Sequence, residues 1–156
     1  MGSRRAAVTL REIGADTVRM ICALRVAPAQ ERLVAPNAVS IAQAYFEPAA
    51  WFRAIYADDE AIGFAMLFDP SRAKEPSHPD TCHLWRFMIA ESHQHRGHGA
   101  AALARLIDHV RTIPRVTKFA LSFVPVDGGP RDFYTRFGFR ETGEVDEGEV
   151  VMELIL

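Results

Sequence analysis

Residues 93–110, HQHRGHGAAALARLIDHV, place histidines, an arginine and glycines directly before a run of good helix formers. The first turn of a helix leaves backbone N–H groups without partners, and the helix dipole adds about half a positive charge there. Gly97 and Gly99 carry no Cβ that would keep a bulky anion away from those N–H groups. Gln94 and Arg96 can add side-chain donors, and arginine suits phosphate in particular. The segment therefore predicts a binding site for a pyrophosphate.

Three interpretations of this segment compete. The first is a solvated helix start, in which each unneeded glycine would cost about 0.5–1 kcal/mol relative to alanine. The second is a metal site built from His93, His95 and His98, but their spacing matches neither the HExxH pair nor a Cys/His zinc site. The third, which we favour, is a cofactor phosphate site without a metal. GHGAAA fits the dinucleotide fingerprint only weakly, because Gly97 follows the predicted strand by several residues and no acid ends the next strand.

A second candidate for chemistry is Tyr134 in the segment RDFYTRFGF, residues 131–139. Phe133, Phe137 and Phe139 lie near it and are expected to pack in the core, so one interpretation makes Tyr134 a core residue as well. The other interpretation points the phenol into a cleft, because it is offset by one position from the apolar face. A phenol beside a leaving group can donate a proton to it, and general-acid help of this kind contributes about 10²–10⁴ in rate.

Residues 94–100 read QHRGHGA and match the pattern Gln/Arg-x-x-Gly-x-Gly/Ala between an apolar strand and a helix. RDFYTRFGF is a second motif, in which a tyrosine is followed by an aromatic-Gly-Phe sequence. With these two motifs in this order, the sequence resembles the GNAT superfamily of acetyl-CoA-dependent N-acetyltransferases over nearly its whole length. APNAVSIAQA, AIYADDEAIGFAML and LWRFMI make it similar, more narrowly, to bacterial spermine/spermidine (diamine) acetyltransferases.

The resemblance implies acetyl-CoA as co-substrate and no metal. The pantetheine arm would pair with the strand LWRFMIA as an added strand, and the diphosphate would lie on the bend after it. The implied cofactor contacts are Phe87, Met88, Ile89, Gln94, His95, Arg96, Gly97, His98, Gly99, Ala100 and Ala101. By its place in the second motif, Tyr134 is the implied general acid that protonates the leaving coenzyme A thiolate. Asp127 stands where the family often has an asparagine near the cofactor, and an aspartate near phosphates is unfavourable unless it faces away.

The implied acceptor is a primary amine of a small molecule, foremost a polyamine such as spermidine or spermine, attacking directly in a ternary complex. At pH 7 only about one alkylammonium group in a few thousand is neutral and nucleophilic, because its pKa is near 10. Carboxylates and aromatic faces suit the cationic groups of such an acceptor. Candidate acceptor-binding residues are Glu31, Tyr45, Glu47, Trp51 and Trp85, and candidate general bases are Glu31, His83, Glu91 and Ser122. Alternatives are a peptide, protein or aminoglycoside amine as acceptor, or a non-catalytic acyl-CoA-binding regulatory module.

Two groups of charged residues lie outside these motifs. Arg86 is unusual in so apolar a strand and needs a partner, which the sequence does not reveal. Asp58, Asp59 and Glu60 are interpreted as a solvated hairpin turn rather than a binding site.

The elements that must position these residues follow from alternation, helical periodicity and Gly/Pro breaks. Strands are predicted at 7–13, 51–57, 61–68, 81–90, 116–125 and 148–156, and an exposed loop is predicted at 69–80. Helices are predicted at 15–26, 39–46 and 98–110, with a further short helix that starts at residue 130 and runs into Gly138. Because several consecutive strands precede the long helix, the expected fold is mixed α/β, with a mostly antiparallel central sheet flanked by helices. The resemblance implies that this is the GNAT acyl-CoA N-acyltransferase fold, and we expect a single domain over residues 1–156.

The composition bounds the possible partners. Lys and Arg number 18 against 20 acidic residues, so no global basic field points to nucleic acid. No apolar run is long enough to span a bilayer, and no signal peptide is evident. Cys22 and Cys82 are far apart and are expected to be reduced thiols, which favours a cytoplasmic protein. A homodimer is predicted through pairing of the apolar strand VVMELIL across subunits.

Overall fold

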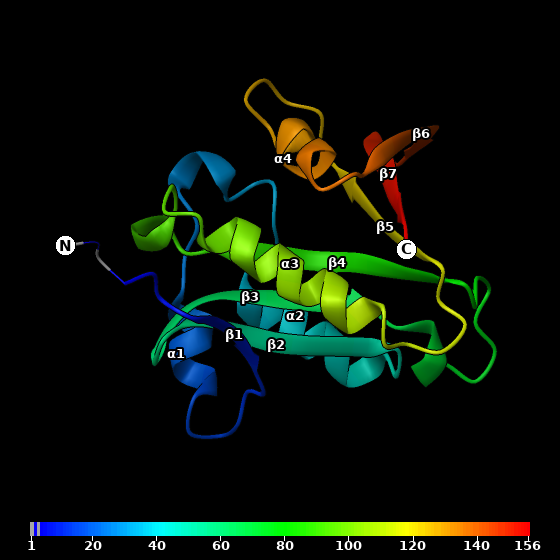
Figure 1. The fold of residues 1–156 in the computed structure, drawn as a ribbon. Helices are drawn as coiled ribbons and strands as arrows, with labels where there is room; N and C mark the ends of the chain where they lie inside the picture. The colour runs from blue at the N-terminus through cyan, green and yellow to red at the C-terminus, as the bar shows by residue number, and fades with distance from the viewer. Residues whose placement is uncertain (1, 3) are drawn as a thin grey trace.

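The computed structural model describes residue 2 and residues 4–156, and its centre is a seven-stranded sheet (Figure 1). The strands are β1 Val8–Arg11, β2 Ala50–Ala57, β3 Glu60–Phe68, β4 Thr81–Ile89, β5 Lys118–Phe123, β6 Arg140–Asp146 and β7 Glu149–Ile155. They lie in the order β1-β2-β3-β4-β5-β7-β6, and every neighbouring pair is antiparallel except β4 and β5. This mostly antiparallel sheet with its flanking helices confirms the predicted fold class.

Helices cover both faces of the sheet (Figure 1). They are α1 Val18–Ala23, α2 Asn37–Phe46, α3 His98–Val110 and α4 Arg131–Arg136, with short 3₁₀ helices η1 Pro28–Gln30, η2 Pro70–Arg72 and η3 Glu91–His93. α3 and α4 pack on one face, and α1 and α2 pack on the other. Among the described residues, no helix is long and apolar enough to cross a membrane.

β3 shows how one strand serves both layers. Phe64 and Met66 pack with Ile21 of α1, whereas Ala65 and Leu67 pack in the cluster that contains the buried side chains of α3. Successive side chains of a strand face opposite sides of the sheet, so a strand that is covered on both faces reads as a continuous apolar run. The two-sided core therefore explains why β3, EAIGFAMLF, is apolar at nearly every position.

Two predicted segments differ from the structure. Residues 140–146, RETGEVD, form β6, where no strand was expected. The sequence contains no strand signal there because all seven residues are exposed and lack apolar alternation. The segment 69–80 was expected to be an exposed loop, but it contains η2, with Asp69 and Pro70 buried. The Asp69 carboxylate accepts hydrogen bonds from the Ser71 backbone N–H at 2.9 Å and from the Ser71 hydroxyl at 2.7 Å. These bonds satisfy the polar group that burial takes out of water.

β7 is not available for the strand pairing that we expected to form a homodimer. It lies between β5 and β6 and is hydrogen-bonded to both, so neither of its edges can accept a partner strand. The edge strand on this side of the sheet is β6. Dimerisation itself stays a prediction.

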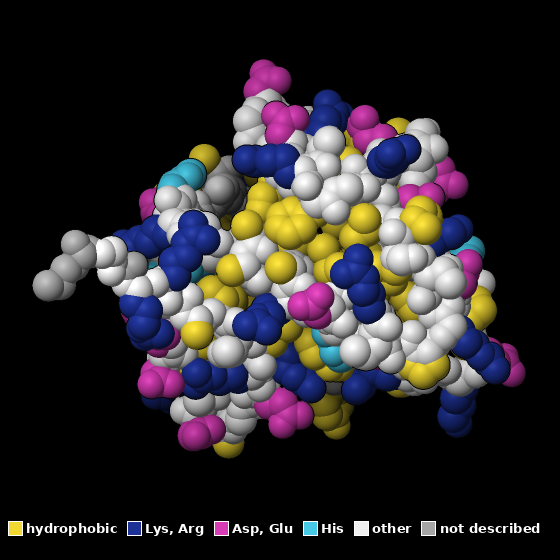
Figure 2. Space-filling model, in the orientation of Figure 1, with side chains coloured by type: hydrophobic (Ala, Val, Ile, Leu, Met, Phe, Trp, Pro, Cys, Tyr) yellow, Lys and Arg dark blue, Asp and Glu magenta, His cyan; other side chains and the backbone are white. Residues whose placement is uncertain are grey.

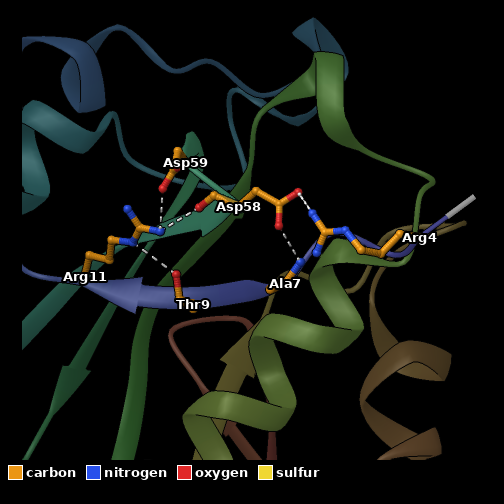
Figure 3. A network of polar contacts seen from close by, with 6 residues as sticks. All are labelled: Arg4, Ala7, Thr9, Arg11, Asp58 and Asp59. Atoms are coloured by element: carbon orange, nitrogen blue, oxygen red, sulfur yellow. Dashed lines mark hydrogen bonds and ion pairs between the residues drawn. The ribbon is translucent and has the colours of Figure 1, made fainter.

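The acidic turn between β2 and β3 is tied to the N-terminal segment (Figure 3). The Asp58 carboxylate accepts the Ala7 backbone N–H and an Arg4 guanidinium N–H, each at 3.1 Å. Arg11 donates to the Asp58 carbonyl oxygen at 2.6 Å and to the Asp59 carboxylate at 3.3 Å. The Ala7 hydrogen bond, together with Arg4, lowers the pKa of Asp58. The turn is therefore an exposed anchor for β1, in agreement with its interpretation as a solvated turn.

Candidate functional site

β4 and β5 are paired over only part of their lengths, and this opens the sheet. Their parallel register ends at Leu84, which lies opposite Leu121. In the ladder with β3, the residues on either side of Trp85 face consecutive residues of β3, so Trp85 is the extra residue of a β-bulge. Beyond the bulge, residues 86–89 pair with β3 alone, and no other strand of the described residues pairs with their second backbone edge, which we call the free edge of β4.

The free edge of β4 carries the backbone groups of Phe87 and Ile89. Ala90 donates its N–H to the Ile62 carbonyl at 2.8 Å, so the backbone groups of Ala90 face the β3 side. Because these groups alternate along a strand, those of Ile89 and Phe87 face the other way. Gln94 lies on that other side, since its Nε2 donates to the Ile89 carbonyl at 2.8 Å. An extended ligand can pair with this edge as an added strand does.

Gly63 lets β3 approach β4 closely beside this edge. A Cβ at Gly63 would overlap the Met88 carbonyl oxygen and would lie 3.1 Å from the Ile89 side chain. Because the obstacle is backbone, only glycine fits. Gly63 lines neither cavity but supports the strand that borders them, and neither motif includes it. The signal for it in the sequence is an isolated glycine inside a strand pattern.

A cavity of about 1890 Å³, called the main cavity below, lies over the free edge of β4. It is bounded by the segment 26–36, the end of β5, the segment 126–130, the first half of α4 and the β6–β7 hairpin. A second cavity of about 610 Å³ lies at the start of α3 and shares Ile89, Gln94 and Phe133 with the first, so the two cavities meet at these residues. On this face of the molecule, hydrophobic side chains gather between α3 and α4 (Figure 2), where Phe133 and Phe137 line the second cavity.

The bend between β4 and α3 contains two residues in the left-handed backbone conformation. Gly97 is the N-cap of α3 with φ +83°, and His95 has φ +63°. Ala101 donates its N–H to the Gly97 carbonyl at 3.2 Å, whereas the N–H groups before it in the first turn lie outside the helical ladder. Of the predicted cofactor residues in this bend, the second cavity is lined by Gln94, His95, Gly97, Gly99 and Ala100, whereas Arg96, His98 and Ala101 line neither cavity.

The amide of Gln94 has a role that differs from the anion donor expected from the sequence. Its Nε2 donates to the Ile89 carbonyl and to Oε1 of Gln30, both at 2.8 Å. These two bonds use both hydrogens of the amide. The backbone N–H of Gln94 donates to the Glu91 carbonyl at 3.2 Å. Gln94 therefore has no donor left for an anion, and the backbone N–H groups that follow it remain available.

The histidines of the bend contact the rest of the protein, and the rings of His93 and His98 lie 6.5 Å apart between centroids. His93 Nε2 lies 3.1 Å from Oε1 of Glu60, and its Nδ1 lies 2.8 Å from the Ser92 hydroxyl. Desolvation is the largest cause that lowers the pKa of His98, and the positive charges of His93 and Arg96 lower that pKa further. Within residue 2 and residues 4–156, the structure contains no group of three or more His, Cys, Asp or Glu side chains that could hold a metal ion.

Tyr134 is at once a core residue and a cavity residue. Its ring packs edge-to-face against Phe133 and Phe139, with centroid distances of 5.3 and 5.7 Å. The residue is buried, yet it lines the main cavity, and no described residue forms a hydrogen bond with its hydroxyl. Burial raises the pKa of the Tyr134 phenol above its ordinary value, so the phenol is protonated at neutral pH. The two interpretations of Tyr134 are therefore compatible.

The structure brings only some of the predicted acceptor residues to the cavity. Glu31, Trp85, His83 and Ser122 line it, whereas Tyr45, Glu47, Trp51 and Glu91 do not. Tyr45 is 85% exposed at the end of α2, and the Glu47 carboxylate accepts the Ala49 N–H at 3.2 Å. Trp51 is buried and stacks on the imidazole of His109 with 4.0 Å between ring centroids.

Arg86 has one hydrogen-bond partner in α2 and one in its own strand. Its Nη2 donates to Oε1 of Gln43 in α2 at 3.1 Å, and its Nη1 donates to the carbonyl of Trp85 at 3.0 Å. Its Nε is buried and has no hydrogen-bond partner among the described residues. Desolvation lowers the pKa of Arg86, and the carboxylate of Glu149 opposes that shift.

Comparison with known proteins agrees with this geometry. The sequence profile of the acetyltransferase (GNAT) family matches residues 18–139. The chain belongs to this family. A spermine/spermidine N(1)-acetyltransferase from Bacillus subtilis (strain 168) is 31% identical over 109 residues, which make up 69% of this chain and 69% of that relative. The predictions of a GNAT family member and of an acetyltransferase enzyme are thereby confirmed.

Solved structures share the fold at lower identity. Spermidine N-acetyltransferase from Vibrio cholerae, in complex with CoA and spermine, has a TM-score of 0.74 and 18% identity, covering 96% of this chain and 95% of its own. The aminoglycoside acetyltransferase AAC(6')-Ib, in complex with ribostamycin and coenzyme A, has a TM-score of 0.77 and 17% identity, covering 96% and 93%. A GNAT family acetyltransferase from Elizabethkingia anophelis with acetyl-CoA bound has a TM-score of 0.67 and 17% identity, covering 96% and 99%.

Proposed function

We propose that this protein transfers the acetyl group of acetyl-CoA to a primary amine of a small polycation, foremost a polyamine such as spermidine or spermine. The observation that carries the proposal is the opening between β4 and β5, whose free backbone edge leads to the bend before α3. Membership of the GNAT family and the likeness to a spermine/spermidine acetyltransferase support it.

In this proposal the cofactor lies along the two cavities. The diphosphate accepts hydrogen bonds from the backbone N–H groups of residues 95–100, at the positive end of the α3 dipole. The pantetheine arm pairs with the backbone of Phe87 and Ile89, and the packing of Met88 supports that strand from the other face. Arg96 contributes positive charge near the diphosphate, whereas desolvation favours the neutral form of His98, so His98 contributes only its backbone donor. Neither side chain lines a cavity.

Tyr134 is the proposed general acid. Direct attack by the amine in a ternary complex gives a tetrahedral intermediate, and its collapse breaks the C–S bond and leaves a thiolate. Because burial keeps the phenol of Tyr134 protonated, its hydroxyl can donate a hydrogen bond or the proton to that sulfur. Its position between the cavity and the aromatic packing of α4 holds the ring in one orientation.

The charge of the main cavity supports a cationic acceptor. Its lining contains the carboxylates Glu31, Asp127, Glu144, Asp146 and Glu149, against the guanidinium groups of Arg32 and Arg86. An excess of carboxylates attracts a polyamine and opposes an anionic acceptor. Asp127 lies in the lining of the main cavity and not of the second one, where the diphosphate would bind.

For the proton that the attacking ammonium must lose, Glu31, His83 and Ser122 are the candidates in the cavity. Desolvation and the charge of His78 lower the pKa of His83, which keeps its imidazole neutral and able to accept a proton. Ser122 donates its hydroxyl to Oε2 of Glu149 at 2.8 Å, so it can relay a proton to that carboxylate.

A thiol-release assay with acetyl-CoA and a panel of acceptors tests this function. Spermidine and spermine are expected to be turned over faster than diamines, aminoglycosides and peptides. Faster turnover of an aminoglycoside or a peptide amine would assign the acceptor to that class instead. Binding of acetyl-CoA without turnover of any acceptor would favour a regulatory module.

A single domain over residues 1–156, a homodimer and a cytoplasmic location also stay predictions.

A further inference from the structure

We infer that Gln30 is a positioning residue that couples the acceptor side of the cavity to the cofactor side. The acceptor wall is defined here as residues 26–36 and the cofactor loop as residues 94–100. The inference rests on the proposed function, because it takes the cofactor loop as the binding site of coenzyme A.

The side-chain oxygen of Gln30 joins the two segments. Its Oε1 accepts the Nε2–H of Gln94 at 2.8 Å and the backbone N–H of Ala27 at 3.2 Å. The bond to Ala27 closes the first turn of η1, where the acceptor wall begins. A carboxamide oxygen has two lone pairs, so both are occupied, one by the wall and one by the cofactor loop.

Gln94 extends this junction to the strand edge. The same Nε2 that donates to Gln30 also donates to the Ile89 carbonyl, and both bonds are partly buried. A second link lies close by, because Glu91 donates its N–H to the Arg25 carbonyl at 2.8 Å. The Glu91 bond therefore holds the residue just before the wall, and among the described residues only the Gln30–Gln94 hydrogen bond joins the wall directly to the cofactor loop.

This arrangement predicts that a ligand on the cofactor loop also restrains the acceptor wall. Coenzyme A that holds the backbone of the loop holds Gln94, and through the shared amide it holds Gln30 and the start of the wall. Such a coupling is reciprocal, so an ordered wall also favours the cofactor. One hydrogen bond gives an effect of about two- to tenfold.

Hydrogen exchange followed by mass spectrometry tests this with coenzyme A alone. In the native chain, saturating coenzyme A is expected to slow amide exchange in residues 94–101 and, by about two- to tenfold, in residues 27–34. In Gln30→Met, which keeps the length of the side chain but lacks the oxygen, the slowing persists in 94–101 and disappears from 27–34. In Gln30→Glu, whose carboxylate accepts both bonds, the slowing of 27–34 returns. If Gln30→Met does not fold, Gln94→Met removes the same bond and leaves the backbone of the loop unchanged.

The outcomes separate this inference from the proposed function. Slowing of 94–101 without slowing of 27–34 in the native chain overturns the coupling and leaves the cofactor site intact. Equal slowing of 27–34 in the native chain and in Gln30→Met also overturns it, because the wall is then protected by another route. Failure of Gln30→Glu to restore the effect contradicts the role of the oxygen. Absence of any slowing in 94–101 overturns the proposed cofactor site together with the coupling.

Discussion

Ser122 of β5 donates its hydroxyl to the Glu149 carboxylate of β7 at 2.8 Å, and both side chains line the main cavity. The bond links the neighbouring strands β5 and β7 in the part of the sheet where β5 is no longer paired with β4. It holds the Glu149 carboxylate at the β7 side of the main cavity, in which we propose that the acceptor binds. A cationic amine gains from this charge because the carboxylate is already oriented before the amine binds.

Glu149→Gln removes that charge and keeps the shape of the side chain and an acceptor for Ser122. We expect KM for spermidine to rise about tenfold, or about 1.4 kcal/mol, with little change in KM for acetyl-CoA. Glu153→Gln on the same strand but outside the cavity lining is the matched control and should change neither constant. An unchanged KM for spermidine in Glu149→Gln would exclude this carboxylate from acceptor binding.

Tyr134→Phe removes the proposed general acid and keeps the aromatic packing. We expect kcat to fall about 10²–10⁴-fold while the Kd for coenzyme A stays within about twofold. Because burial raises the pKa of Tyr134, the native enzyme should show no loss of activity from tyrosine ionisation below about pH 10. Steady-state kinetics over this pH range check both points. Full turnover in Tyr134→Phe would show that another group, or water, protonates the thiolate.

Gly99→Ala separates cofactor binding from folding. A Cβ at Gly99 would meet the side chains of Ile89 and Phe133 at an ordinary 3.8 Å, so the fold accommodates it. Alanine near a helix start is expected to raise the free energy of unfolding slightly, by up to about 1 kcal/mol. Because Gly99 lines the second cavity, the added methyl group should weaken coenzyme A binding about tenfold or more, as measured by calorimetry. Ala104→Ser, on the exposed side of α3, is the control.

Gly63→Ala, unlike Gly99→Ala, should lower the stability of the protein, and its loss of function should follow from that loss of stability. The new Cβ would overlap the Met88 carbonyl, and the backbone of β4 must move to accept it. We expect the free energy of unfolding to fall by about 1–3 kcal/mol, together with a higher KM for acetyl-CoA. Denaturant unfolding measures the first quantity. A variant as stable as the native protein would show that β4 is not held as tightly as described.

His109 should make stability depend on pH. Its ring stacks on Trp51, and its buried Nε2 has no hydrogen-bond partner among the described residues. Desolvation, opposed by Asp69 and assisted by Arg53, lowers the pKa of His109. As the pH falls below about 6.5, His109 therefore takes up a proton in the unfolded chain at a higher pH than in the folded chain. The free energy of unfolding falls as the pH falls from 7 toward 5.

His109→Phe keeps a ring beside Trp51 and removes the titrating group. We expect the difference in thermal midpoint between pH 7 and pH 5 to become smaller in this variant. His95→Asn, at an exposed position whose positive φ suits asparagine, is the control and should leave the difference unchanged. The same pH dependence in His109→Phe and in the native chain would place the effect elsewhere.

Much of the fold is predictable because its periodic apolar segments are long. β3 and β4 are buried on both faces or nearly so, and such strands are recognisable without knowing their partners. β6 is not predictable in this way, because RETGEVD is exposed throughout and is a strand only through its pairing with β7. Helix α2 was recognisable, but the outward direction of Tyr45 depends on how the helix packs.

The candidate site is predictable where backbone chemistry defines it and not where distant side chains meet. Gly97 and Gly99 signal a helix start that can receive an anion, and the structure places both in the second cavity. The amide of Gln94 is different, because its partner Gln30 lies 64 residues earlier and belongs to no motif. Spacing alone could not show that this amide is already occupied.

The central claim is that backbone amides at the start of α3 bind the diphosphate of coenzyme A. A crystal structure of the protein with coenzyme A tests it most directly. We predict that the diphosphate oxygens lie within hydrogen-bond distance of N–H groups of residues 95–100, with the pantetheine arm beside Phe87 and Ile89. Coenzyme A bound at another surface, or a diphosphate held by side chains away from this bend, would contradict the account.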